Sequence, residues 1–296
     1  MSGANAASAN VFRAAMGMAS PLRRLLTFVL YLMVPFFAVP SDADDRLPIF
    51  DVHMHYNQGA WSGLTPKQIV EWMDLAGVSR ALVSSTPDEG TLTLHRYDPG
   101  RFIAELRPYG RTVNSVNWYR HPEVVPFLES RLINGIYRGI GEIHFYAGKE
   151  VNTAVVRAVV AQARSLGIFL HVHSDAEAIA ALYAIDPEVR ILWAHAGMTE
   201  PADVVAETMK RYPTLSAELS YRAEEILPDG ELDPEWRDLL VTFSHRFVIG
   251  TDTHVNARWV EYEDLVDAHR AWLSLLSQDH ARAIAFENAE RMFRID

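Results

Sequence analysis

The chain has 296 residues, 49% hydrophobic and 22% charged, a composition that excludes a disordered or fibrous protein. Its formal net charge is −11 and it contains three lysines, which argues against a surface that binds nucleic acid. It contains no cysteine, so disulfides, thiolate catalysis and sulfur-ligated metals are excluded.

The first 43 residues have the pattern of an export signal. Arg23 and Arg24 precede the apolar run 25–39, and small residues up to Ala43 suit cleavage by a signal peptidase. The alternative is a retained membrane anchor, but the apolar run is shorter than the ~20 residues that span a bilayer. We therefore expect 1–43 to be cleaved, no stable membrane span afterwards, and an exported protein, periplasmic or secreted. The mature chain would carry 24 basic and 37 acidic residues.

Residues 44–296 alternate short apolar runs with segments of helical periodicity. The apolar runs are rich in Val, Ile and Phe, which predicts strands covered on both faces by helices. We place eight strands at 48–54, 79–85, 111–117, 136–145, 167–173, 190–195, 214–219 and 247–252. Helices are expected between them, for instance at 65–76, 152–166, 175–184, 201–212 and 260–276, with N-caps at Thr65 and Asp175.

Two α/β architectures fit this alternation, an open doubly wound sheet and a closed barrel. No glycine-rich dinucleotide-binding turn follows the first strand, which argues against the open sheet. The eight strands and the 253 residues from Asp44 onward suit a closed barrel, which typically takes ~250 residues. The sequence therefore predicts an α/β fold with a single (β/α)8 TIM barrel over 44–296.

Histidines and carboxylates stand at the ends of five predicted strands. His53 and His55 end the first strand, and side chains two residues apart on a strand share one face. The other strands end in Glu142 and His144, His171 and His173, His195, and Asp252. Because active sites of this barrel gather at the C-terminal ends of the strands, we expect these groups to converge on a divalent metal ion.

This set of residues resembles the amidohydrolase superfamily, whose ligands are H-x-H on strand one, histidines on strands five and six, and aspartate on strand eight. The runs 193–197 and 284–293 are similar to the amidohydrolase-related or type 2 branch, which includes lactonases, hydrolases and nonoxidative decarboxylases. The run 139–142 also resembles TatD-like nucleases, in which a glutamate on strand four contacts the metals. Members with a carbamylated lysine on strand four match poorly, because Glu142 stands there.

The resemblance implies that His53, His55 and Asp252 bind a first metal ion, completed by a histidine of the fifth strand. His171 and His173 share a face and both fit; His173 is preferred because it leads directly into the following helix. We expect zinc first, with manganese, iron or cobalt as alternatives, because the available ligands are nitrogen and oxygen.

The resemblance leaves the number of ions open. If Glu142 bridges, a second ion would be bound by His195 and the fifth-strand histidine. If one ion binds, His195 would act as a general acid/base or stabilise an oxyanion.

The expected reaction is hydrolysis of a small carboxylic ester, lactone or amide. A bound divalent cation lowers the pKa of water to about 7, and Asp252 can accept a proton and pass it to the leaving group. The nearest alternative is nonoxidative decarboxylation of an unsaturated or aromatic acid. A TatD-like nuclease is disfavoured by the acidic surface, and a catalytically silent ligand-binding barrel by the complete ligand set.

Further residues are predicted to bind the substrate. Arg222, together with Tyr221 and Glu218, could hold a substrate carboxylate, the alternative being a surface salt bridge. His144 could contact the substrate or the ligands, the alternative being a packed core histidine. We expect five other histidines to be surface or capping residues, namely His95, His121, His245, His269 and His280.

Overall fold

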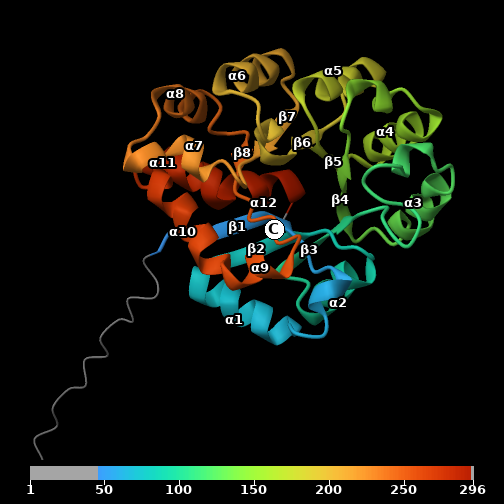
Figure 1. Ribbon diagram of the computed structural model, residues 1–296, viewed down its shortest axis with the longest axis horizontal. Helices are drawn as coiled ribbons and strands as arrows, with labels where there is room; N and C mark the ends of the chain where they lie inside the picture. Colours follow the sequence, from blue (N-terminus) through green and yellow to red (C-terminus); the bar gives the residue numbers. More distant parts are fainter. Residues whose placement is uncertain (1–45, 295–296) are drawn as a thin grey trace, which may run out of the picture. The chain divides into compact units, whose positions relative to one another are not determined.

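Eight parallel strands follow one another in chain order in the computed structural model, which describes residues 46–294 (Figure 1). A parallel bridge between Asp51 and Ile249 joins the first strand to the segment that continues the last. This closure confirms the predicted (β/α)8 barrel and rules out the open sheet. The strands are β1 (Ile49–Met54), β2 (Val78–Val83), β3 (Phe102–Leu106), β4 (Tyr137–His144), β5 (Phe169–His173), β6 (Ile191–Trp193), β7 (Leu215–Glu218) and β8 (Phe247–Val248).

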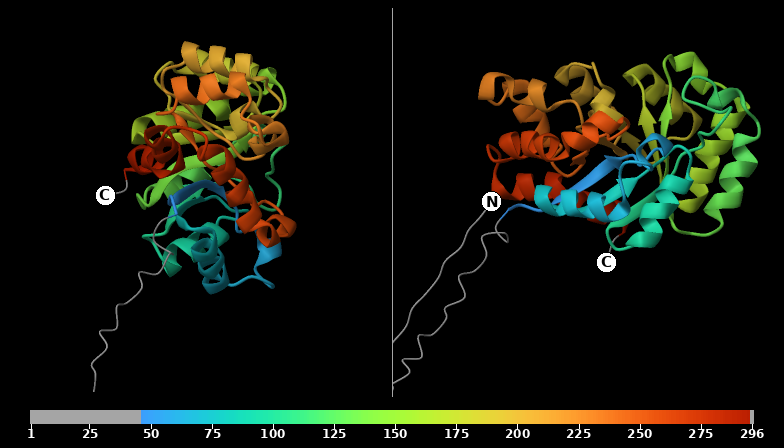
Figure 2. Two further views of the ribbon diagram at one scale, coloured as in Figure 1. Left: turned by 90° about the vertical axis from the view of Figure 1, so that its left-hand side faces the viewer. Right: turned by 60° about the horizontal axis from the view of Figure 1, so that its bottom comes forward.

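Helices cover the outside of the strands (Figures 1 and 2). Two predicted N-caps are present: Thr65 accepts a hydrogen bond from the backbone of Gln68, and Asp175 accepts one from Ala178. Within 46–294, no helix combines the length and apolar character needed to cross a membrane. The helices are α1 (Pro66–Ala76), α2 (Glu89–Tyr97), α3 (Val124–Leu132), α4 (Ala154–Leu166), α5 (Ala176–Ile185), α6 (Ala202–Arg211), α7 (Ala223–Ile226), α8 (Pro234–Thr242), α9 (Asn256–Val260), α10 (Tyr262–Leu273), α11 (Gln278–Arg282) and α12 (Asn288–Phe293).

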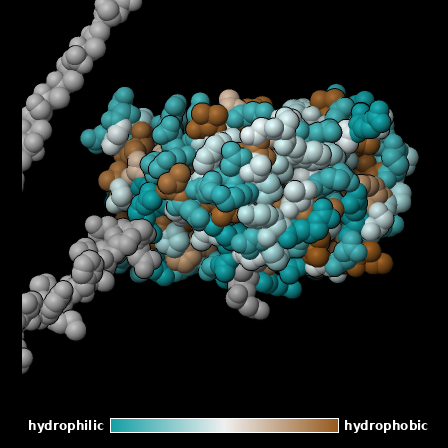
Figure 3. All heavy atoms as spheres, turned by 90° about the horizontal axis from the view of Figure 1, so that it is seen from below, coloured by the Kyte–Doolittle hydropathy of each residue, from teal (hydrophilic) through white to brown (hydrophobic). Residues whose placement is uncertain are grey.

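The predicted export signal, 1–43, lies outside the described residues. On the face of the barrel seen in Figure 3, hydrophobic residues are scattered among hydrophilic ones. Single exposed apolar residues of this kind are ordinary for globular proteins.

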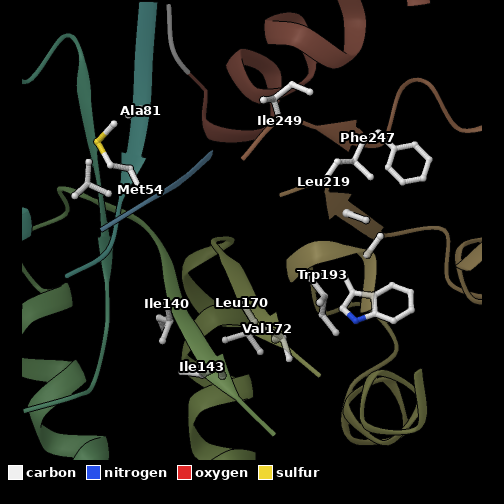
Figure 4. Packing of buried hydrophobic residues seen from close by; sticks show 14 of the residues in the cluster. Met54, Ala81, Ile140, Ile143, Leu170, Val172, Trp193, Leu219, Phe247 and Ile249 are labelled. Carbon is white, nitrogen blue, oxygen red and sulfur yellow. The ribbon is translucent and has the colours of Figure 1, made fainter. Parts of the chain in front are cut away.

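The apolar core has two parts. The larger lies between strands and helices and includes Met54, Val172 and Trp193, which Figure 4 shows on β1, β5 and β6. The smaller joins Phe50, Leu82, Ile103, Phe169, Leu192 and Val248, from six strands, to Phe293 of α12. Residues from six strands can contact one another only inside a barrel, so this cluster fills the interior toward the start of the strands. The strand ends that follow it are left for polar side chains.

The third strand is displaced from its predicted position. The sequence predicts a strand at 111–117, but the structure has β3 at Phe102–Leu106, and 111–117 lies in the following loop. The prediction was wrong because Glu105 and Arg107 interrupt the apolar run with charged residues. Both are buried: Glu105 Oε2 lies 3.0 Å from His171 Nδ1, and Arg107 Nη2 lies 2.9 Å from Glu142 Oε2. Charges that look incompatible with a strand are thus compensated inside the barrel.

Closure of the barrel depends on one buried carboxylate. β8 is two residues long, and the backbone bond from Val52 N to Ile249 O, at 2.8 Å, links it to β1. Asp51 adds to this link, because its carboxylate accepts from Thr251 N at 3.0 Å, from Thr251 Oγ at 2.6 Å and from the hydroxyl of Tyr262 at 3.1 Å. Three segments of the chain are therefore held together by one side chain.

Replacing Asp51 by alanine should lower the free energy of unfolding by roughly 3 kcal/mol, because several buried donors would lose their acceptor. Urea unfolding monitored by circular dichroism measures the change. The matched control is Asp74→Ala, whose side chain is 62% exposed and pairs with Arg101, and which should cost about 0.5 kcal/mol. Equal losses in the two variants would contradict a role for Asp51 in closing the barrel.

Candidate metal centre

His53 and His55 form the first half of the site, at the C-terminal end of β1. Their Nε2 atoms lie 3.0 Å apart. The Nδ1 atom of His53 lies 2.9 Å from Glu218 Oε1, and Nδ1 of His55 donates to the backbone oxygen of Ser84. A neutral imidazole that donates from Nδ1 keeps its lone pair on Nε2. Both Nε2 atoms are therefore oriented as metal ligands.

Asp252 completes the first ligand group. Its Oδ1 atom lies 3.2 Å from His55 Nε2 and 3.5 Å from His53 Nε2. Ligand atoms of a tetrahedral zinc site with ~2.0–2.1 Å bonds lie ~3.3 Å apart, which these distances match. Asp252 Oδ1 is buried and has no hydrogen-bond partner among the residues that the structure describes, so it is poised for a cation.

A second ligand group adjoins the first. Glu142 Oε1 lies 3.0 Å from His173 Nδ1 and 3.6 Å from His195 Nε2, and these two nitrogens are 3.2 Å apart. The other carboxylate oxygen of Glu142 lies 3.5 Å from the Nε2 atoms of His53 and His55. Glu142 thus faces both groups, as a bridging carboxylate would.

The two histidines of β5 are placed differently. His173 belongs to the second group, and its side chain is partly exposed. His171 is fully buried, and its Nδ1 atom lies 3.0 Å from Glu105 Oε2. Its ring centroid is 4.5 Å from that of His53. The structure therefore brings His173 into a three-ligand group and leaves His171 beside His53, paired with a carboxylate of β3.

Glu218, at the end of β7, holds two of the ligand imidazoles. It is fully buried, and its Oε1 atom lies 2.9 Å from His53 Nδ1, 3.1 Å from His195 Nδ1 and 2.6 Å from the backbone nitrogen of His195. The sequence reading of Glu218 as a substrate contact or a surface salt bridge is therefore wrong. The signal that could have revealed its role is an acidic residue ending an apolar strand, the same signal that singled out Asp252.

The carboxylates and imidazoles compensate each other's charges. Burial raises the pKa of Glu218, but the neighbouring His195 and His53 outweigh it and hold that pKa well below its usual range. Burial raises the pKa of Asp252 too, yet the neighbouring His53, His254 and His55 keep it well below its usual range. Without a metal ion, protons on the imidazoles balance these carboxylates, and a divalent cation can take over that charge.

His144 and Tyr221 lie beside the ligand groups. The ring of His144 stacks on that of His173 with centroids 4.6 Å apart, and its Nδ1 atom lies 3.1 Å from the hydroxyl of Tyr109. Burial lowers the pKa of His144 to about 3, so its imidazole is neutral. Tyr221 is 40% exposed, and its ring centroid is 5.4 Å from that of His195. Both residues are placed where a substrate could touch them.

Arg222 is not placed for substrate binding. Its side chain is fully buried, and its two terminal nitrogens donate to the backbone oxygens of Met198 and Glu200. Within 46–294 it forms no hydrogen bond or ion pair with a predicted ligand. The guanidinium holds the loop after β6 in place, which leaves it unavailable to a substrate carboxylate.

One histidine expected at the surface is buried. Nε2 of His269, in α10, lies 3.0 Å from the backbone oxygen of Gly250, and burial lowers the pKa of His269 to about 4. It therefore supports the segment that leads to Asp252.

A model of the amidohydrolase family, Amidohydro_2, matches residues 43–295. The chain belongs to this family. It is therefore a metal-dependent hydrolase of the amidohydrolase superfamily, and the family together with its groups of histidines and carboxylates indicates a divalent metal site. A search of curated proteins found no match.

Solved structures share the fold at low sequence identity. One is a probable 2-pyrone-4,6-dicarboxylic acid hydrolase from Acinetobacter baumannii with bound citric acid, 14% identical, with a TM-score of 0.57 over 83% of this chain and 99% of that one. Another is 5-carboxyvanillate decarboxylase from Novosphingobium aromaticivorans, complexed with manganese and a nitrobenzoic acid, 12% identical, TM-score 0.55 over 85% and 97%. A third is a TatD homolog from Escherichia coli, 13% identical, TM-score 0.60 over 84% and 98%.

Metal-free protein should lose stability as the pH rises from 6.5 to 9. Burial lowers the pKa of His195, but Glu218 and Glu142 outweigh it and raise that pKa to about 9. A raised histidine pKa stabilises the fold fully below the unfolded value of ~6.5, and this stabilisation is lost toward the folded value. We expect a loss of roughly 3 kcal/mol across this range, measured by urea unfolding of chelator-treated protein.

Metal-loaded protein is the control, because a cation bound beside Glu142 opposes a proton on the neighbouring His195. Its free energy of unfolding should fall far less over the same pH range. A metal-free protein that is equally stable at both ends of the range would contradict the charge balance described here.

Proposed function

We propose that this protein hydrolyses a small carboxylic ester or lactone, with amides as the second choice, and that its metal is zinc. The observation that supports this most is the convergence of the two ligand groups, in which His195 of one group faces Asp252 of the other. Nε2 of His195 lies 4.0 Å from Oδ2 of Asp252, so a proton donor and a proton acceptor lie beside both ligand groups.

A divalent cation, when bound, would supply Lewis-acid polarisation of the scissile carbonyl and activation of water. Asp252 contributes a carboxylate that is ionised at neutral pH, with Oδ2 as the atom that would accept a proton. His254 Nδ1 lies 3.2 Å from this oxygen and holds it in place. His195 Nε2 is oriented by Glu218 and Ser220 behind it, and would donate to the developing oxyanion.

His144 and Tyr221, which lie beside the ligand groups, suit a small substrate. His144 is held by Tyr109, whose hydroxyl accepts from the backbone nitrogen of His144 at 2.9 Å and therefore donates its own proton to Nδ1. The remaining proton of the neutral imidazole is then on Nε2, 3.7 Å from Glu142 Oε1. His144 would thus offer an N–H donor to a substrate oxygen, and Tyr221 an aromatic wall at the rim.

Zinc is favoured by the tetrahedral spacing of the nitrogen and oxygen ligands, while manganese, iron and cobalt accept the same donor types. Metal content of protein purified without chelator would separate these ions. A stoichiometry near zero that added zinc or manganese did not restore would favour a catalytically silent barrel.

Nonoxidative decarboxylation is the second candidate, and the structural likeness to 5-carboxyvanillate decarboxylase favours it. The two reactions differ in their products. A carboxylic acid substrate that releases carbon dioxide, in the absence of any turnover of lactones and aryl esters, would replace hydrolysis as the proposed reaction.

Zinc-loaded protein should turn over a member of a panel of lactones and aryl esters, and Asp252→Asn should reduce kcat at least ~1000-fold, because a ligand and the base are lost together. His121→Ala is the control, since His121 pairs with Glu123 on the surface, and it should keep nearly full activity. A wild-type kcat in the Asp252→Asn variant would refute the proposed mechanism.

A further inference from the structure

The first residues of β4, β5 and β6 lie at the end of the barrel opposite to the metal centre. The three strands are parallel neighbours (Figure 1), so their starts share one end and the ligand residues share the other. Arg138 is the second residue of β4, Arg190 directly precedes β6, and Arg294 follows α12. All three arginines line one pocket of about 230 Å³, and none of the residues that line it is acidic.

Two of the guanidinium groups meet at Gly167, the residue after α4. Arg190 donates from Nη1 to the backbone oxygen of Gly167 at 2.9 Å and from Nη2 to that of Met292 at 3.2 Å. Nη2 of Arg294 lies 3.7 Å from the position that a Cβ atom on Gly167 would take. Burial and the charge of Arg294 lower the pKa of Arg190 below its usual value. Two positive charges are therefore held close together in a partly buried place.

Other arginines at the same end of the barrel have carboxylate partners. Arg101, directly before β3, lies with Nη1 2.5 Å from Asp74 Oδ1, and Arg164, in the last turn of α4, lies with Nε 3.7 Å from Asp186 Oδ2. Within residues 46–294, the three arginines of the pocket form no such ion pair. The pocket is thus a local concentration of positive charge on a chain whose net charge is −11.

Hydrogen-bond donors remain available on these side chains. A guanidinium has five N–H donors, and Arg138 uses Nη1 on the backbone oxygen of Gly135, 3.0 Å away. In the described part of the chain, the side chain of Arg294 forms no hydrogen bond. Guanidinium forks match the geometry of carboxylate and phosphate groups, which they bind through two parallel hydrogen bonds. The rest of the lining includes the apolar residues Leu166, Ile168, Met292 and Phe293.

We infer that this pocket binds a small organic anion, whose carboxylate or phosphate head pairs with Arg138, Arg190 and Arg294 and whose apolar body packs on Ile168 and Met292. The pocket is smaller than the ~300–1,000 Å³ of pockets for drug-sized ligands, which suits one charged group on a small body. The bound anion would connect the starts of β4 and β6 to the end of α12. This site is separate from the metal centre, so the inference does not depend on the proposed function.

The test is a calorimetric titration of the zinc-loaded full chain with phenyl phosphate and, separately, with benzoate. The two probes share an apolar ring and differ in the charged head, so the comparison distinguishes a phosphate site from a carboxylate site. At least one probe should bind with a Kd below ~1 mM. Arg294→Gln and Arg138→Gln should each weaken that binding about 10-fold or more, because each removes charge-assisted hydrogen bonds to the anion.

Arg164→Gln is the matched control. Arg164 lies two residues before Leu166 and its side chain is 50% exposed, but it does not line the pocket and it pairs with Asp186. Its loss should leave the Kd of the probe within about twofold of the wild-type value. The melting temperature is a second readout. Saturating probe should raise it in wild-type protein and in Arg164→Gln, and much less in Arg294→Gln.

Three outcomes would overturn the inference, and each leaves the hydrolase proposal untouched. The first is that neither probe binds at millimolar concentration. The second is binding that persists unchanged in Arg294→Gln and Arg138→Gln, because the anion would then bind elsewhere, for instance on the zinc ion.

The third outcome concerns the acidic end of the chain. A variant that ends at Arg294 lacks Ile295 and Asp296, and it should bind the probes as the full chain does. Binding that is seen only in this shortened variant would mean that the chain's own carboxylates occupy the arginines, and that the pocket takes no separate anion.

Discussion

The mutual compensation of buried carboxylates and imidazoles is the interaction on which this structure depends. An ionised carboxylate inside an apolar barrel is strongly unfavourable by itself. Glu142, Glu218 and Asp252 are tolerated because histidines from β1, β5 and β6 face them, with nitrogen-to-oxygen distances between 2.9 and 4.0 Å. Since these groups come from six different strands or the segments directly after them, displacing any of those strands would leave a buried charge unpaired. The same arrangement is what makes the site able to hold a divalent cation.

Barrel closure and site formation are therefore coupled. Asp51 fastens β1 to the segment after β8, and these two segments carry His53, His55 and Asp252. The backbone bond from Asp252 N to His53 O, at 2.6 Å, sits between two ligands of the same group. A contact that closes the sheet thus also fixes the distance between ligand atoms, which must be correct to a few tenths of an ångström for a metal to bind.

A second set of residues orients the ligands. Glu218 holds His53 and His195 through Nδ1, and Arg107 holds Glu142. Such partners fix the orientation of the imidazole rings and the position of the carboxylate. They come from β7 and from the residue after β3, and neither belongs to the two ligand groups described above. Strand ends without a histidine ligand, such as those of β3 and β7, therefore also carry polar residues that hold the ligands in place.

The sequence by itself determined what is local. The period-two spacing of His53 and His55, the apolar runs of seven of the eight strands and the acidic end of the last strand all follow from alternation along one segment. Tertiary structure alone decided the rest, because hydrogen-bond partners far apart in the chain are invisible to such patterns. Arg107, directly after β3, made this segment look too charged for a buried strand, because its partner Glu142 lies far away in the sequence. Arg222 suggested a substrate contact, but in the structure its guanidinium donates to backbone oxygens. Whether a buried charged residue serves chemistry or packing is set by what surrounds it, and that is decided only when the barrel closes.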